Sequence, residues 1–324
     1  MSALVPAISV VVATRGRAGR LAELVEALED QDIDKPFEVV IVDDGSKDQT
    51  WSTLQELARR TTFTLVPVRH DRNRGAAAAR NSGWRAARAP LVAFTDDDCA
   101  PTTGWLAALH RALGAADLVQ GVTLPNPAQT HLFGPFSRSL TETEEGTYPT
   151  ANVAYRRAAL ELVGGFDERY SACEDTDLAM RVLEAGGRSA FVPEALVHHA
   201  VHVSDFRAYW REKKRWQAVP LIVREHPGLR LKMHNRLFWR PSHPPALAAG
   251  FGLAVAGAAA VGRFGPGMIA GALLQWPYLR FRSRSALVPG GRRRWIALPL
   301  LLIGDVYEVL LLLTASVRHR TLVL

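Results

Sequence analysis

A run of apolar residues that ends in three consecutive carboxylates most constrains how this chain can fold. Residues 91–94 suit a strand buried on both faces, and Asp96, Asp97 and Asp98 follow almost at once. Like charges this close repel each other unless a cation or several hydrogen-bond donors compensate them. Crowded carboxylate oxygens are typical ligands of Mg²⁺ or Mn²⁺. The motif alone also fits a solvated acidic turn, so its neighbours must decide between the two.

Two earlier apolar runs predict neighbouring strands of one sheet. They are residues 8–13 and 37–42, and between them the apolar residues of segment 21–28 recur at helical spacing. A strand, a helix and a second strand in this order imply a right-handed crossover and a parallel sheet, with ligands outside the carboxyl ends of the strands. The second strand ends there in Asp43 and Asp44. These residues suit either a turn with a helix cap or hydrogen bonds to a base or ribose.

The chain up to about residue 200 continues this alternation. It predicts helices at residues 51–58, 76–88, 105–113, 158–163 and 174–183, and strands at residues 63–66, 151–157 and 190–193. Arg80 lies on an alanine-rich helix near the acidic edge, where its side chain can contact a phosphate or a base, or remain solvated. Residues 125–146 contain three prolines and show no clear periodicity. They predict a long loop that selects the acceptor.

A second acidic group opens the helix predicted at residues 174–183. Glu174, Asp175 and Asp177 lie in its first turn, where the helix dipole favours negative charge. The dipole gives a structural explanation of the group, and the alternative is a catalytic carboxylate whose neighbours raise its proton affinity. His199 follows the last predicted strand. It is either structural or a ligand, because neutral imidazole suits Mn²⁺ as carboxylates do.

Charge is spread unevenly along the chain. The formal net charge is +7, and arginines crowd residues 280–284 and 292–294. This asymmetry indicates an anionic partner, either nucleic acid or an anionic lipid surface, and the apolar sequence nearby favours lipid and no nucleic acid. Cys99 and Cys173 are too few for a disulfide framework and lack the spacing of a zinc site, so they suit a reducing compartment. Residues 1–6 lack the features of a signal peptide, which favours the cytoplasm for the catalytic part.

The end of the chain predicts helices at a membrane. Residues 206–244 mix basic and aromatic side chains, Trp210 among them, as helices at a membrane interface do. The same pattern also fits the acceptor side of the cleft or the ordinary basic face of a domain. Residues 246–261 and 268–279 are apolar, but each piece is shorter than the ~20 residues of a full span. A tight hairpin or re-entrant pair is therefore favoured over two crossings. The alternative is a soluble helical subdomain or a dimer interface.

A third apolar segment, residues 295–317, is long enough to span a membrane. It contains Asp305 and Glu308, which are costly in lipid and would have to face protein or the surface. Arginines flank the segment on both sides, so the charge bias gives no clear orientation. We expect three regions, which are a catalytic domain at 1–205, basic and aromatic interfacial helices at 206–244, and a hydrophobic membrane-associated helical region at 245–324.

Taken together, the polar blocks of residues 8–202 resemble the family 2 glycosyltransferases. The matching blocks are Thr14-Arg15, Asp43-Asp44-Gly45-Ser46, Asn73-Arg74-Gly75, Ala79-Arg80-Asn81, Asp96-Asp97-Asp98, Asn152, Gly164-Gly165-Phe166-Asp167 and Glu174-Asp175. No single block is decisive, whereas their number and order make coincidence very unlikely. The resemblance implies an α/β chain of the GT-A fold, with a mostly parallel sheet and flanking helices, followed here by an all-α hydrophobic region. It also implies an enzyme.

The resemblance assigns roles to individual residues. It implies that the nucleotide sugar is bound by Thr14, Arg15, Asp43, Asp44, Arg80, Asp96 and Asp97. It implies a divalent cation, Mg²⁺ or Mn²⁺, on Asp96, Asp98 and His199. Asp175 matches the catalytic base, with Glu174 beside it to raise its proton affinity. Asn152 and Trp210 are expected to contact the acceptor.

These roles describe an inverting, metal-dependent glycosyltransferase at the cytoplasmic face of the cell membrane. We expect it to move a sugar from a nucleoside-diphosphate donor to a hydroxyl group of a glycan or lipid-linked acceptor of the cell envelope. One alternative is a polyprenyl-phosphate sugar synthase, whose phosphate acceptor needs no general base. Another is a non-catalytic membrane scaffold with a vestigial nucleotide site. A dinucleotide oxidoreductase is disfavoured because no Gly-x-Gly-x-x-Gly motif follows the first strand.

Overall fold

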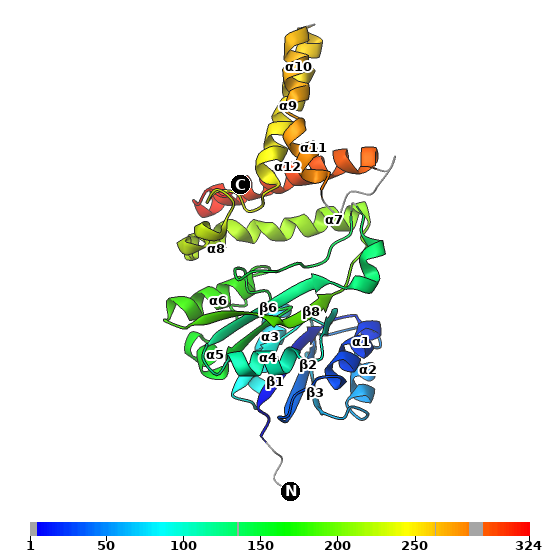
Figure 1. The fold of residues 1–324 in the computed structure, drawn as a ribbon, viewed down its shortest axis with the longest axis vertical. Coiled ribbons are helices and arrows are strands. Elements are labelled where there is room, and N and C mark those ends of the chain that lie inside the picture. The colour runs from blue at the N-terminus through cyan, green and yellow to red at the C-terminus, as the bar shows by residue number, and fades with distance from the viewer. Residues whose placement is uncertain (1–4, 135, 263, 285–293) are drawn as a thin grey trace. The chain divides into compact units, whose positions relative to one another are not determined.

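The computed structural model describes residues 5–134, 136–262, 264–284 and 294–324 (Figure 1). The chain forms two compact units. The first comprises Met1–Thr130 and Ser139–Val201, and the second comprises His131–Arg138 and His202–Leu324. The division falls close to the boundary expected at residue 205. The two regions expected at 206–244 and 245–324 both belong to the second unit, and the arginines at 292 and 293 lie outside the described residues.

One eight-stranded sheet forms the centre of the first unit. Its strands are β1 (Ile8–Thr14), β2 (Phe37–Asp43), β3 (Thr64–Arg69), β4 (Leu91–Phe94), β5 (Cys99–Pro101), β6 (Leu118–Pro125), β7 (Val153–Arg156) and β8 (Ser189–His199), in the order β3-β2-β1-β4-β7-β6-β8-β5. Strands β1 to β4 run parallel to one another. β7 is antiparallel to both of its neighbours, and β8 is parallel to β6 but antiparallel to β5. The sheet is therefore mixed, and its parallel part lies in the first half of the unit.

Helices cover both faces of this sheet. They are α1 (Ala18–Glu29), α2 (Thr50–Leu57), α3 (Ala76–Ala86), α4 (Trp105–Ala112), α5 (Arg157–Val163) and α6 (Glu174–Glu184). Successive side chains of a strand point to opposite faces. Val10 and Val12 accordingly join a core with the apolar residues of α1, α2 and α4, whereas Val11 joins a core with those of α3, α5 and α6. Because both faces are covered, the central strands read as continuous apolar runs.

The parallel strands end together at one edge. Thr14 pairs with Asp43 in the register of β1 and β2, and the backbone N–H of Asp44 donates to the carbonyl of Thr14 at 2.9 Å. β4 pairs with β1 as far as Phe94, so the acids at 96–98 follow at the same edge. Asp43 and Asp44, and the acids at 96–98, thus lie at carboxyl ends of parallel strands, as expected.

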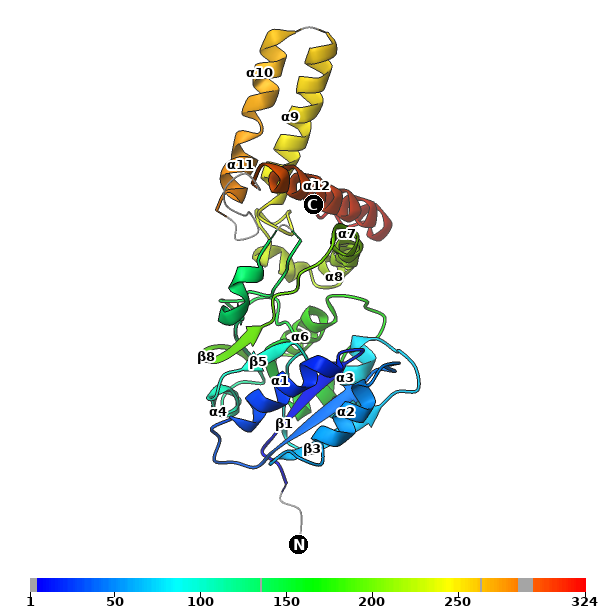
Figure 2. The same cartoon turned by 90° about the vertical axis from the view of Figure 1, so that its right-hand side faces the viewer.

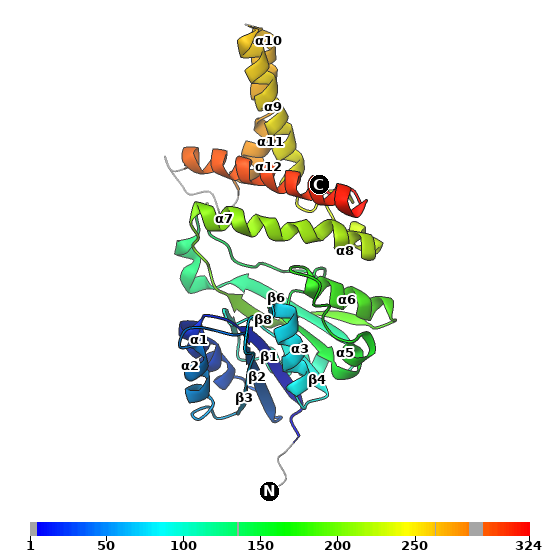
Figure 3. The same ribbon diagram turned by 180° about the vertical axis from the view of Figure 1, so that it is seen from behind.

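The second unit is built from helices. These are α7 (Phe206–Lys213), η2 (Lys214–Ala218), α8 (Val219–Glu225), η3 (Pro227–Lys232), α9 (His243–Val261), α10 (Gly265–Leu273), α11 (Trp276–Arg282) and α12 (Arg294–His319). A further 3-10 helix, η1 (Pro127–Leu132), lies in the loop expected at 125–146. Figure 2 shows α9 and α10 as an antiparallel hairpin, and Figure 3 shows α12 running beside α7 and α8. Within the described residues, His243–Val261 and Ala297–His319 are long and apolar enough to cross a membrane.

Candidate active site

Asp97 and Asp98 bind side chains from the first strand and the turn after it. The hydroxyl of Thr14 donates to Asp97 at 2.6 Å, and Nη1 of Arg17 donates to Asp97 at 2.8 Å and to Asp98 at 2.6 Å. These donors compensate the crowded negative charge. Burial raises the pKa of Asp97 to about 6, against the lowering influence of Arg17 and the Thr14 hydroxyl. The sequence analysis missed Arg17, although it lies only two residues after Arg15.

Arg80 joins two acids that are far apart in the sequence. Its Nη2 donates to Oδ1 of Asp96 at 2.9 Å, and its Nη1 donates to Oε1 of Glu174 at 2.8 Å. Burial alone would lower the pKa of Arg80, but Asp96 and Glu174, together with Asp175, raise it above its ordinary value. The guanidinium therefore stays charged. Through it, the structure brings the two acidic groups singled out in the sequence to one place.

Asp175 lies in the first turn of α6 and remains partly exposed, whereas Glu174 beside it is buried. The backbone N–H of Thr176 donates to Oδ1 of Asp175 at 2.8 Å. Asp177 points elsewhere, because Arg181 of the same helix donates to its Oδ2 at 2.6 Å. Of the three acids that open α6, Asp175 is thus the one that combines exposure with proximity to Arg80.

Asp44 is held by the loop that follows β3. Nδ1 of His70 and the backbone N–H of Arg74 contact Oδ1 of Asp44 at 2.8 Å each, and the N–H of Gly75 donates to Oδ2 at 2.8 Å. The other ring nitrogen of His70 is 2.8 Å from the hydroxyl of Ser82. The carboxylate is therefore fixed by three donors. His70 was missed by the sequence analysis, since its role depends on how the loop folds back.

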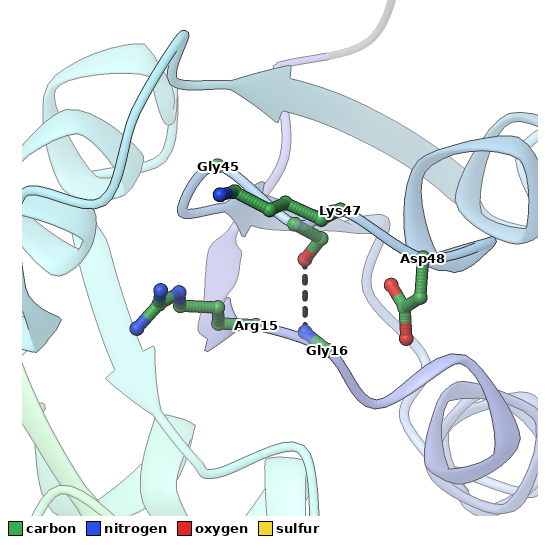
Figure 4. A pocket seen from close by; sticks show the side chains of 6 residues that line it. Arg15, Gly16, Gly45, Lys47 and Asp48 are labelled. Carbon is green, nitrogen blue, oxygen red and sulfur yellow. Dashed lines mark hydrogen bonds between the residues drawn. The ribbon is translucent and has the colours of Figure 1, made fainter.

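A hollow of about 420 Å³ lies between the turns that follow β1 and β2 (Figure 4). It is lined by Arg15, Gly16, Gly45, Ser46, Lys47 and Asp48, and the N–H of Gly16 donates to the Ser46 hydroxyl at 2.9 Å. Gly45 has a φ of +68°, and a Cβ there would lie 2.5 Å from the carbonyl carbon of Arg72. Only glycine fits this close approach. Arg15 thus lines a hollow beside Asp43, which is fully buried and accepts the N–H of Ser46 at 3.0 Å.

Three side chains offer ligand atoms for a cation. Those of Asp98, Cys99 and His199 all lie within 4.8 Å of one another, and Nε2 of His199 is 3.5 Å from Oδ1 of Asp98. Nδ1 of His199 is 2.8 Å from the carbonyl of Ala200, which can only accept, so Nδ1 carries the proton and Nε2 is the basic nitrogen. A carboxylate oxygen and this nitrogen fit Mg²⁺ or Mn²⁺.

Two further residues, Cys99 and Asp96, bear on which atoms could bind a cation here. Burial, with Asp96 and Asp98, raises the pKa of Cys99 well above its ordinary value, so the thiol stays protonated and is a poor ligand. Asp96 is not among the three converging side chains, because Arg80 holds its Oδ1.

The two residues expected at the acceptor lie in different surroundings. Asn152 is fully buried, where the indole N–H of Trp105 donates to its Oδ1 and its own amide donates to the carbonyls of Val122 and Ala195, all at 2.8 Å. These contacts tie α4 to β6 and β8, so the amide group of Asn152 is already used within the core. Trp210 belongs to the second unit, where its ring lies 4.2 Å from that of Tyr307.

Comparison with known proteins identifies the relatives of this chain. The model of Glycosyl transferase family 2 matches residues 9–164, and that of Glycosyl transferase family group 2 matches residues 91–304. The pre-mycofactocin glycosyltransferase of Mycobacterium tuberculosis is 34% identical over 237 residues, which cover 68% of this chain and 48% of that protein. The chain thus spans about half the length of this relative. Validoxylamine A glucosyltransferase of Streptomyces hygroscopicus subsp. jinggangensis is 29% identical over 292 residues, covering 72% of this chain and 64% of that protein.

A solved structure shows the same fold. It is a mannosyltransferase from Pyrobaculum calidifontis in complex with GDP-Man and Mn²⁺, with a TM-score of 0.64 and 22% identity. The similarity covers 95% of this chain and 88% of that one, so it extends through the helical second unit. Together, the family models, the relatives and this fold show that the chain belongs to the family 2 glycosyltransferases, enzymes of glycosyl transfer, and has the GT-A fold.

Proposed function

We propose that this enzyme moves a sugar from a nucleoside-diphosphate donor to a hydroxyl group of a glycan or lipid-linked acceptor, with inversion at the anomeric carbon. The observation that carries the proposal is the bridge by which Arg80 joins Asp96 to Glu174. Because Asp175 adjoins Glu174, the bridge supports a site shared by the proposed base and the carboxylates proposed to hold the donor. The base and the donor site must lie close together, because the acceptor oxygen loses its proton to the base while it attacks the donor.

The donor is proposed to lie along the carboxyl edge of β1, β2 and β4. Arg15 lines the hollow after β1 and β2, and Thr14 and Asp43 end these strands, with Asp44 directly after them. The hollow suits a nucleoside. The solved mannosyltransferase of similar fold holds GDP-Man, and this supports a nucleotide sugar as the donor class. Asp96 and Asp97 then lie on the side of the diphosphate, with Arg80 and Arg17 as fixed positive charges.

Asp98 and His199 are proposed to hold a divalent cation, with Asp96 nearby. A cation bound there would supply positive charge to the diphosphate as it leaves. The hydrogen bond from His199 to Ala200 fixes the ring with its basic nitrogen toward Asp98, as ligand histidines are usually oriented. Mn²⁺ in the similar mannosyltransferase supports this assignment.

In the proposed reaction, Asp175 takes the proton of the acceptor hydroxyl. The hydroxyl oxygen forms a bond to the anomeric carbon while the bond between that carbon and the diphosphate oxygen breaks. Glu174 lies next to Asp175 and is held by Arg80. A neighbouring carboxylate raises the proton affinity of a base, whereas the Arg80 cation, which also interacts with Asp175, lowers it.

Asp175→Asn tests this assignment. Asparagine keeps the shape of the side chain but cannot take a proton, so we expect transfer to a hydroxyl acceptor to fall by roughly 10²–10⁴-fold. Circular dichroism should stay unchanged.

Asp34→Asn, at an exposed acid outside the site, is the matched control and should keep full activity. Turnover near that of the wild type would remove Asp175 from this role. If a polyprenyl phosphate were then the accepted substrate, the polyprenyl-phosphate sugar synthase would replace the present proposal.

We also propose that the second unit attaches the enzyme to the cytoplasmic face of a membrane. The two long apolar helices support this location. So does the charge of residues 202–324, which contain 19 lysines and arginines against five acids. A basic surface beside apolar helices favours anionic lipids, and a membrane location would suit a lipid-linked acceptor.

A further inference from the structure

The carboxylates of α12, the later of the two candidate spans, face other helices. Glu308 is fully buried, and its Oε2 accepts from Nζ of Lys213 on α7 at 2.5 Å. Its Oε1 accepts from Nε of Arg240, which precedes α9, at 2.6 Å. Nε2 of His243, the first residue of α9, is 3.6 Å from the same oxygen. Glu308 therefore binds α12 to both α7 and the start of α9.

Asp305 makes a second connection one turn earlier. Its Oδ2 accepts from the hydroxyl of Tyr278 at 2.8 Å and also pairs with Arg282, both on α11. Lys213 is 4.0 Å from its other oxygen. If α12 moved away into lipid, these buried charges would lose their partners. The ion pairs thus fix α12 against the rest of the unit.

The opposite side of α12 is apolar and exposed. Ile303, Leu310 and Val317 follow one another at intervals of seven residues and so lie along one side of the helix. Half of the apolar window of α12 is buried (50%), whereas only 22% of that of α9 is buried. α12 is therefore a two-sided helix, with charges toward protein and an apolar stripe outward, as interfacial helices have.

The α9–α10 hairpin has the opposite character. Its two helices approach through glycines, since a Cβ on Gly252 would lie 2.7 Å from the carbonyl oxygen of Gly271, and a Cβ on Gly271 would lie 2.6 Å from that of Gly252. Small residues at such contacts are typical of helices packed in lipid. The amide of Gln275 is also used inside the hairpin, where it donates to the carbonyl of Ala249 at 2.9 Å.

Large apolar side chains cover the outside of both legs of the hairpin. Phe251, Leu253, Val261, Met268, Ile269 and Leu273 are all exposed. The 19 residues of α9 extend about 28 Å at 1.5 Å per residue, close to the ~30 Å hydrocarbon core of a bilayer. The start of α9 packs against α11 and α12, whereas from Phe251 to Val261 the described part of the unit leaves large apolar side chains exposed. This exposed part of the hairpin fits acyl chains. Exposed Arg280 and Arg284, at and just after the end of α11, suit anionic head groups.

We propose that the α9–α10 hairpin enters the lipid bilayer, whereas α12, although long enough to span it, lies along the membrane surface. The two ends of the hairpin and the whole of α12 then stay on one side of the membrane. This inference rests on the membrane association proposed above and is independent of the glycosyl transfer chemistry. It reverses the expectation from length alone, under which α12 is the better candidate span.

Nitroxide labels on single cysteines of the full chain test the arrangement. The sites are Ile303→Cys, Leu310→Cys and Val317→Cys on α12, and Leu253→Cys and Val261→Cys on α9. All are exposed, so the substitutions should not disturb folding. The protein is reconstituted into vesicles of phosphatidylcholine and phosphatidylglycerol, and label depth is read from collision with oxygen and with a water-soluble nickel complex. Leu162→Cys on α5 is the control outside the membrane region, and the parent chain gives the background of buried Cys99 and Cys173.

The three labels on α12 should lie at one depth near the head groups. The two labels on α9 should differ in depth by roughly 12 Å, because eight residues separate them along the helix. Steps of about 10 Å between successive α12 labels would show a spanning α12 and overturn the inference. Equal, shallow depths at 253 and 261 would overturn the insertion of the hairpin. Failure of the protein to float with the vesicles would overturn the membrane association as well. None of these results bears on the proposed role of Asp175.

Discussion

Single residues of the site divide into those that the sequence shows and those that only the fold shows. Asp44 and Asp96 follow apolar runs, so their place at the sheet edge could be predicted from the pattern. Arg17 and His70 could not, because each reaches its acid through a turn whose path depends on tertiary contacts. Residues that compensate buried charge must exist for physical reasons, but a sequence pattern does not say which they are.

His70 offers a test of how Asp44 is positioned. His70→Ala removes a donor from Oδ1 of Asp44 and leaves the buried carboxylate with two donors, both from the backbone of one loop. We expect the KM for the nucleotide sugar to rise about tenfold, as for the loss of about 1–1.5 kcal/mol of hydrogen bonding, while kcat changes little. Steady-state kinetics against donor concentration measure this split.

His70→Asn is the matched control for this prediction, because an asparagine amide can donate from nearly the position of Nδ1. It should restore most of the donor affinity. A role of His70 in packing alone would make the two variants equally defective. A fall in kcat at unchanged KM would show instead that His70 acts on the chemical step, contrary to the positioning role.

Among the structural elements, the strands β1 to β4 and β7 were expected from the sequence, whereas β5 and β6 were not. β5 has three residues, and β6 follows a segment whose apolar pattern weakens, so neither was expected from the sequence. β8 was expected to end at Pro193 but continues to His199. The register between β6 and β8 shifts after Gly121, where Pro193 and its neighbours bulge out of the pairing. Proline tolerates such a bulge, since its missing N–H needs no partner there.

Gly121 is expected to be essential to this bulge. A Cβ at this position would lie 2.2 Å from the carbonyl oxygen of Ala195 and 2.6 Å from the Asn152 amide, neither of which can move freely. Gly121→Ala should therefore lower the free energy of unfolding by about 1–3 kcal/mol, the usual cost of overpacking. Urea denaturation followed by circular dichroism measures it.

Gly19→Ala, in α1, is the comparison for Gly121, because nothing lies within 4 Å of its added Cβ. Alanine at an open helical position should leave stability unchanged or raise it by up to about 1 kcal/mol. If Gly121→Ala were as stable as this variant, the close approach of β6 and β8 at the bulge would be contradicted.

At the scale of the whole molecule, the chain forms two compact units, one built around the sheet and one built from helices. The family blocks end near residue 202, and the basic and apolar segments begin there. The sequence did not show that residues 206–244 and 245–324 fold into one unit. It depends on Glu308 and Asp305, whose partners come from α7, α11 and the segment before α9. A hydropathy pattern marks such carboxylates as costly but does not identify the cations that neutralise them.

Because these ion pairs lie within the second unit, breaking them should affect that unit alone. Glu308→Gln keeps the size of the side chain but removes the charge opposite buried Lys213 and partly exposed Arg240, which leaves both cations short of a partner. Loss of one partner of a buried pair costs about 3–5 kcal/mol. We expect amide hydrogen exchange of α12 to accelerate by at least 100-fold, the equivalent of about 2.7 kcal/mol. Protection of β1 and β4 and the affinity for the nucleotide sugar should not change.

Glu161→Gln, at an exposed acid of α5, should alter neither unit. Equal loss of protection in β1 and α12 would show that the two units unfold as one, and would contradict the independence of the sheet of the first unit from the helices of the second.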